Sequence, residues 1–137
     1  MSVTVKQACE DKWEAYKADC SGFVRAVASQ LGVSLTGLAN NITDQIQAGP
    51  WVSLGTGSGG AAAAKAAEGY LVIGAKKATA HGHVVVVVSG TCAQGKYPHA
   101  YWGRLGGVGK KDETINWSWN ATDRDQVVYG YYPSKTF

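Results

Sequence analysis

Five consecutive valines at 84–88 restrict the folds open to this chain more than any other stretch of its sequence. Valine is β-branched and favours extended backbone, so the run "HVVVVVSG" (83–90) predicts a strand that is buried on both faces. Neighbouring segments have the same β-branched or aromatic character. We therefore predict further strands at "YLVIGA" (70–75), "YPHAYWG" (97–103), "INWSW" (115–119) and "QVVYGYY" (126–132). Pro98 indicates an edge strand, because proline cannot donate a ladder hydrogen bond.

The chain before residue 69 has a different, helical periodicity. Apolar residues recur at spacings of three and four over 3–17, which predicts a first helix. A second helix is predicted to open at Asp19 or Cys20 and to stop near Gly32, and a short third one covers Leu38, Ile42 and Ile46 before Gly49-Pro50. Helices first and strands afterwards predict an α+β domain, with the N-terminal helices packed on an antiparallel sheet.

One segment breaks this division. "GTGSGGAAAAKAAEG" (55–69) is rich in glycine and alanine, and we interpret it as a flexible loop followed by a short helix over 61–68. A tolerated surface insertion is the favoured reading, and a loop that borders a substrate cleft is the alternative. The length of 137 residues suits a single domain over 1–137.

Composition excludes several classes of function. The net charge of +3 is small and scattered, and no basic run exceeds two residues, so we expect no nucleic-acid partner. The longest apolar run is too short to span a bilayer, so no membrane partner is expected. The first twelve residues contain no apolar segment of the kind found in secretory signals, so we expect any export to proceed without one. We expect no cofactor and no bound metal.

Cys20 is the first candidate for chemistry. A cysteine at a helix start lies near unpaired N–H groups and positive potential, which favour its nucleophilic thiolate and can hold an oxyanion. His83, where the five-valine strand begins, is the candidate general base. Core packing, a disulfide and a metal ligand are the competing roles for a lone cysteine. His81 and His83 face the same way on a strand and together raise a zinc alternative, but no further histidine lies upstream to complete such a site.

Several motifs in fixed order carry a family resemblance. "DCSGFV" (19–24) followed by "GYLVIGAKKATAHGHVVVVVSG" (69–90) resembles the papain-like NlpC-type cysteine peptidases of bacterial cell walls. "AAEGYLVI" (66–73), "KYP" (96–98) and "WNATDRD" (119–125) make the chain more similar to one branch, the first family of type VI secretion amidase effectors. Together these blocks cover most of the chain.

The resemblance implies a papain-like fold and a peptidoglycan amidase that cuts stem peptides between D-glutamate and meso-diaminopimelate. It implies Cys20 as nucleophile and His83 as general base. It further implies a monomeric antibacterial effector, exported without an N-terminal signal peptide, that reaches the periplasm of Gram-negative target cells and is countered by a cognate immunity protein. A non-catalytic module whose tryptophans stack on wall sugars, and a papain-like acyltransferase, are the alternatives.

A third catalytic residue is not fixed by any motif. His99, on the next predicted strand, is a candidate to orient His83, and a solvated His99 is at least as plausible. Cys9 and Cys92 either pair or stay as separate free thiols. Core positions are the favoured interpretation for each of Trp102, Trp117 and Trp119. Within "TDRD" (122–125) we expect a turn or cap residue and surface charge.

Overall fold

The computed structural model describes residues 3–79, 81–135 and 137. Three helices come first, α1 (Val5–Tyr16), α2 (Cys20–Gln30) and α3 (Ala39–Gln45). A six-stranded sheet follows, with the strand order β1-β6-β2-β3-β4-β5 and antiparallel pairing between all neighbours. Its strands are β1 (Val52–Thr56), β2 (Val72–Lys76), β3 (His83–Ala93), β4 (Tyr97–Trp102), β5 (Lys110–Thr114) and β6 (Val128–Tyr131). The predicted α+β class, with N-terminal helices on an antiparallel sheet, is confirmed.

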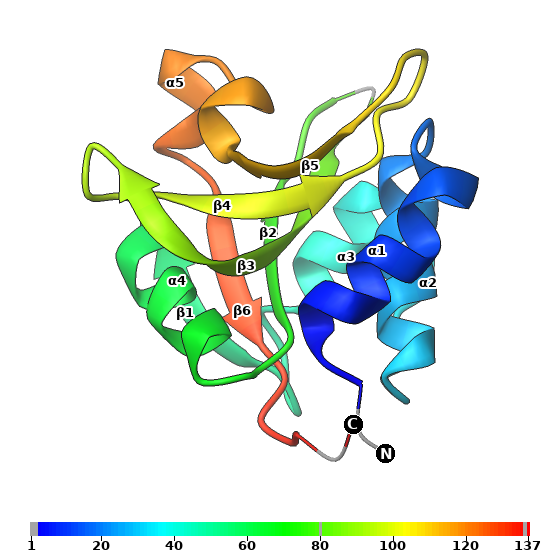
Figure 1. The fold of residues 1–137 in the computed structure, drawn as a ribbon. Coiled ribbons are helices and arrows are strands. Elements are labelled where there is room, and N and C mark those ends of the chain that lie inside the picture. The colour runs from blue at the N-terminus through cyan, green and yellow to red at the C-terminus, as the bar shows by residue number, and fades with distance from the viewer. Residues whose placement is uncertain (1–2, 80, 136) are drawn as a thin grey trace.

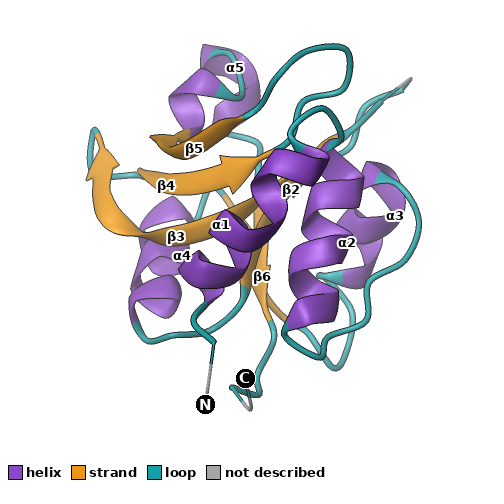
Figure 2. Ribbon diagram, turned by 45° about the vertical axis from the view of Figure 1, so that its right-hand side comes forward, coloured by secondary structure: helices purple, strands orange, loops and turns teal. Residues whose placement is uncertain are grey.

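Helices cover both faces of the sheet. In Figures 1 and 2, α1, α2 and α3 lie together on one side, whereas α4 (Gly59–Ala67) lies on the other. The valine run serves both layers, because successive strand residues point to opposite faces. Val84, Val86 and Val88 enter the core under α1–α3, and Val85 and Val87 enter the core under α4. This double burial explains why the strand is apolar at every position.

The helix starts and stops follow local chemistry. The side chain of Thr4 accepts a hydrogen bond from the Gln7 amide and caps α1. Gly32 has a φ of +78°, the left-handed conformation that closes α2 at low cost because glycine has no Cβ. The three predicted N-terminal helices are therefore confirmed. No helix in the described part of the chain is long and apolar enough to cross a bilayer.

The segment 55–69 is not a surface insertion. β1 already includes residues 55 and 56, and α4 begins two residues before the predicted helix. Ala62 and Ala63 are buried against the sheet, and Gly59 has no room for a side chain beside the Lys96 carbonyl oxygen. Small residues bring this helix close to the strands, so the alanine-rich composition reflects tight packing on the face opposite α1–α3.

Two strand predictions also need correction. β4 lies between β3 and β5, so Pro98 is not on an edge strand. The β3–β4 pairing shifts register between Val88 and Ala93, and such a bulge accommodates a residue that cannot donate. The segment 115–119 is no strand either: it starts with a 3₁₀ turn, η1 (Ile115–Trp117), and β5 precedes it. A short helix, α5 (Ala121–Arg124), follows and is capped by Asn120.

Candidate active site

Cys20 is the first residue of α2, as the sequence predicted. Asp19 forms the cap, because its Oδ1 accepts a 3.0 Å hydrogen bond from the Gly22 amide. A Cβ on residue 22 would lie 2.3 Å from Asp19 Oδ2, so this cap requires glycine at that position. The motif Asp-Cys-Ser-Gly thus fixes how α2 begins. Cys20 is 8% exposed, buried in the core but still reachable from the surface.

His83 is the first residue of β3 and pairs with Lys76 of β2. Its ring packs on that of Trp119 in a T-shaped arrangement, with ring centroids 5.0 Å apart and an interplanar angle of 70°. Trp119 is itself buried and Trp102 fully so, as expected, whereas Trp117 is 62% exposed and does not belong to the core. The indole of Trp119 forms one wall that limits where the imidazole can point.

The thiol and the imidazole line the same cavity. A hollow of about 190 Å³ is lined by Cys20, His83, Arg104, Leu105 and Ser118. A larger one of about 570 Å³ adjoins it, since Cys20 and Leu105 line both. Leu38, Asn40 and His81 are among the residues around the larger one. The structure therefore brings the two predicted site residues together at the junction of two hollows, which we call the cleft.

Burial controls the protonation of the pair. It raises the pKa of the Cys20 thiol, although hydrogen bonds from the backbone of Val84, Ser21 and Cys20 itself oppose this effect. Burial, and secondly the positive charge of Arg104, lower the pKa of His83 from 6.5 to about 4. The expectation that the helix start favours the thiolate is thus overruled by desolvation. At neutral pH the pair is a neutral thiol beside a neutral imidazole.

A backbone contact fixes one wall of the cleft. The carbonyl oxygen of Lys17 accepts hydrogen bonds from the amides of Arg104 (3.0 Å) and Gly109 (2.7 Å). A Cβ on Gly103 would lie 2.3 Å from the Tyr16 carbonyl oxygen, so glycine is required where β4 meets the turn between α1 and α2. The loop 103–109 and the helix start that carries Cys20 are consequently held on the same short turn.

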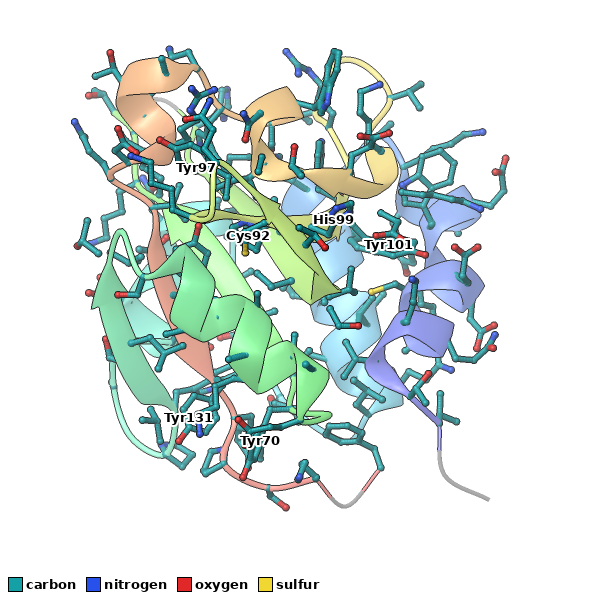
Figure 3. The ribbon with its side chains drawn as sticks, turned by 60° about the vertical axis from the view of Figure 1, so that its left-hand side comes forward. Tyr70, Cys92, Tyr97, His99, Tyr101 and Tyr131 are labelled. Carbon is teal, nitrogen blue, oxygen red and sulfur yellow. The ribbon has the colours of Figure 1, made fainter. Side chains whose placement is uncertain are left out.

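His99 does not reach this site. It pairs with Val88 across β3 and β4, five positions along β3 from His83, a separation of about 16 Å at the usual rise of a strand. Its Nδ1 lies 3.0 Å from Asp112 Oδ1. Figure 3 shows His99 beside Tyr101 on the part of the sheet that faces α1. The structure thus separates His99 from the imidazole that it was a candidate to orient.

The remaining candidates lie outside the thiol–imidazole pair. Cys9 is fully buried in α1, Cys92 lies on β3, and all three cysteines are free, so no disulfide joins them. His81 lines the larger hollow. Within residues 3–79, 81–135 and 137, no three His, Cys, Asp or Glu side chains gather closely enough to hold a metal ion.

Sequence reasoning missed several residues of the cleft. Arg104 and Leu105 lie in the glycine-rich stretch "GRLGGVG" (103–109), where a cation and an apolar residue among glycines were a usable signal. Asn40 bridges α3 to the chain before β3, through hydrogen bonds of 2.9 and 3.2 Å with the Ala78 backbone. No sequence pattern marked Asn40, because its partner is 38 residues away.

A thiol at a helix start beside an imidazole at a strand start can perform nucleophilic acyl transfer. No family model matches the sequence. The chain is 40% identical over 139 residues to "Peptidoglycan amidase Tse1" of Pseudomonas aeruginosa, covering 93% of this chain and 88% of that protein. This similarity defines the class of the protein, a hydrolase. More narrowly, the chain belongs to the first family of type VI secretion amidase effectors, the family that its motifs indicated.

Proposed function

We propose that the protein is a peptidoglycan amidase that hydrolyses the bond between D-glutamate and meso-diaminopimelate in stem peptides, with Cys20 as nucleophile and His83 as acid–base. The observation that carries the proposal is the meeting of Cys20 and His83 in one cavity, in a chain 40% identical to a peptidoglycan amidase. The bond is the one implied by the motif resemblance, and a hollow of about 570 Å³ beside Cys20 is available to the substrate.

The first half of the reaction starts from the neutral pair. His83 accepts the thiol proton as the Cys20 sulfur attacks the amide carbonyl carbon. Negative charge then develops on the carbonyl oxygen, next to the backbone N–H groups at the start of α2. The imidazolium donates its proton to the leaving amine, the carbon–nitrogen bond breaks, and a thioester to the glutamyl fragment remains.

The second half regenerates the enzyme. Neutral His83 accepts a proton from water as the water oxygen attacks the thioester carbonyl carbon. The carbon–sulfur bond breaks, and the proton held by His83 returns to sulfur. The released acyl fragment carries a new carboxylate. A wide pH plateau is expected, because the neutral pair persists from about pH 4 up to the raised pKa of Cys20.

Digestion of purified sacculi tests this function. We expect the wild-type protein to expose new amines on diaminopimelate and to leave the glycan chains intact, as read by mass analysis of the fragments. Cys20→Ala should release nothing, whereas Cys92→Ala, which alters a thiol outside the cleft, should behave as wild type. Stem peptides that stay intact with the wild-type protein would contradict the proposal.

We also propose that this activity takes effect in the periplasm of a target cell, and that an immunity protein blocks the cleft. Leu38 and Leu105, which are 65% and 61% exposed, stand at the cleft and offer apolar contacts to an inserted inhibitor. A fusion directed to the periplasm should lyse Gram-negative cells, and its Cys20→Ala version should not. Equal growth with the two fusions would contradict the proposed antibacterial role but would leave the proposed amidase reaction untested by this assay and dependent on the sacculus digestion.

A further inference from the structure

Arg104 is a cation at the reaction centre that the mechanism above does not use. It lines the smaller hollow together with Cys20 and His83, and its side chain is exposed to solvent. After burial, the positive charge of Arg104 is the second cause that lowers the pKa of the His83 imidazole. A cation that makes the general base weaker is a cost to the free enzyme. This cost suggests that Arg104 has a task during substrate binding.

The charge of Arg104 is available to a ligand. Among the described residues, no carboxylate forms an ion pair with it, whereas Lys6, Lys17, Lys65, Lys76, Lys77 and Lys111 all pair with acidic side chains. Its side chain also makes none of the side-chain hydrogen bonds found in the described part of the protein. An unpaired guanidinium presents five N–H donors in a planar fork that fits a carboxylate with two parallel hydrogen bonds.

The position of Arg104 relative to the nucleophile is fixed by the backbone. Its amide donates to the Lys17 carbonyl oxygen, three residues before Cys20, and its own carbonyl oxygen accepts from Gly107 at 3.1 Å. The aliphatic part of its side chain passes close to Gly107, where an added Cβ would lie 3.6 Å from Arg104 Cδ. These contacts hold the base of the side chain within reach of a group bound beside Cys20.

We propose that Arg104 is a specificity-determining residue that binds a free carboxylate of the stem peptide next to the scissile amide. The inference rests on the proposed function. A γ-linked D-glutamate keeps its α-carboxylate free on the acyl side of that bond, and diaminopimelate carries a second free carboxylate on the amine side. Either group supplies the planar anion that a guanidinium recognises.

Substrate binding would then also adjust the base. A carboxylate paired with Arg104 offsets the positive charge near His83, so the imidazole regains basicity when the substrate is in place. The same contact therefore positions the amide over Cys20 and restores proton affinity where the thiol must lose its proton. An amidated or otherwise neutral substrate would lose both effects.

The test uses three synthetic tripeptides: L-Ala-γ-D-Glu-meso-diaminopimelate with its chain-terminal carboxyl amidated, as the next peptide bond of a stem would leave it, and two versions in which either the Glu α-carboxylate or the remaining diaminopimelate carboxylate is also an amide. We expect wild-type kcat/KM to fall about 10- to 100-fold for one amidated version, which identifies the group that is bound. Arg104→Gln should lose a similar factor on the free acid and discriminate no longer. Arg104→Lys should recover part of the loss, and Lys96→Gln, which removes a charge from the remote β3–β4 turn, should match wild type.

A pH profile separates this role from a structural one. In Arg104→Gln the acid limb of kcat/KM should move to higher pH, because burial still lowers the pKa of His83 but the additional effect of the Arg104 charge is gone. If wild type cleaves all three tripeptides equally well, or if Arg104→Gln keeps the preference, Arg104 does not bind the carboxylate. If wild type cleaves none of them, the proposed function itself fails. Should Arg104→Gln not fold, the discrimination by wild type and Arg104→Lys still decides.

Discussion

His83 and His99 lie on neighbouring strands in opposite kinds of surroundings. The ring of His99 is held by Asp112, whose other carboxylate oxygen lies 2.8 Å from Lys6 Nζ. Tyr101 donates to Glu10 nearby, and Glu10 also pairs with Lys111. These contacts join α1 to β4 and β5, and Figure 3 shows His99 and Tyr101 on the same part of the sheet.

His83 has no such carboxylate partner among the described residues. Its neighbours are the indole of Trp119, the cation of Arg104 and the cavity that it shares with Cys20. The comparison teaches that a well-paired histidine is the structural one here. The histidine to which we assign proton transfer, His83, is the one that is desolvated, lacks a neutralising partner among the described residues and has access to a thiol.

Removal of the Cys20 sulfur is expected to have the largest effect of any single change. Cys20→Ala should lower kcat by about 10⁴-fold or more, because the covalent route is lost. Its far-ultraviolet spectrum should stay that of wild type. Cys92→Ala serves as the matched control, since Cys92 is only partly buried and lines neither hollow of the cleft. A similar loss in both variants would mean that the thiol in the cleft has no special role.

Separate substitution of the two histidines compares their roles directly. His83→Gln should lower kcat by about 10²- to 10⁴-fold, because an amide cannot act as a general base. His99→Gln should leave kcat within a few-fold and instead lower stability by about 1 kcal/mol, through loss of its contact with Asp112. Activity and thermal unfolding, measured on both variants, test these two expected effects. A kinetic defect in His99→Gln as large as that in His83→Gln would reverse the assignment.

The buried His83 should also make the fold sensitive to acid. Its pKa is about 4 in the folded state and 6.5 in the reference state, so the unfolded chain binds the extra proton first as pH falls. The stability is fully present above pH 6.5 and is lost progressively toward pH 4. Between pH 7 and pH 5 this amounts to about 2 kcal/mol at most.

Urea titrations across that range measure the effect. His83→Gln should flatten the dependence on pH, because the group responsible is absent. The lowered pKa values of Glu10, Asp11 and Glu14 place their own contributions at lower pH, outside the range compared. A wild-type stability that does not change between pH 7 and pH 5 would show that His83 is better hydrated than its burial indicates.

The smallest expected effect is that of a substitution close to His99, at Tyr101. Tyr101→Phe deletes the hydroxyl that donates to Glu10 and keeps the buried ring. A loss of about 0.5–1.5 kcal/mol is expected, with kcat unaltered, since neither residue lines the cleft. Chemical denaturation together with the tripeptide assay checks both halves. Any fall in kcat beyond a few-fold would connect this network to the chemistry after all.

Hydrophobic periodicity and helix capping were enough to predict where several helices and strands begin. The Asp19 cap and the valine run located the starts of α2 and β3, and these two starts hold Cys20 and His83. They could be read from sequence because each depends on neighbouring residues. The layer formed by α4 was misread, because small residues look the same in a loose loop and in a helix pressed onto a sheet.

The cleft walls depend on partners far apart in the chain. The residues around Pro98 do not indicate that β5 pairs with β4 and forms the edge of the sheet. Those around Arg104 do not indicate that its amide donates to the Lys17 carbonyl oxygen. The effect of burial on the pKa of the Cys20 thiol could not be predicted for the same reason. The effect of the helix start is local, whereas the desolvation that overrides it comes from the packing of α2 against distant strands.

The two hydrogen bonds that end on the Lys17 carbonyl oxygen make the loop between Arg104 and Gly109 an exchangeable unit. Both of its ends are fastened to one acceptor through backbone amides, and position 109 must stay glycine because a Cβ there would lie 1.8 Å from the Trp102 carbonyl oxygen. Side chains between the two anchors can therefore be replaced without moving Cys20. For protein engineering, this makes the loop the natural place to graft new substrate preferences, as antibodies do with their hypervariable loops on a constant framework.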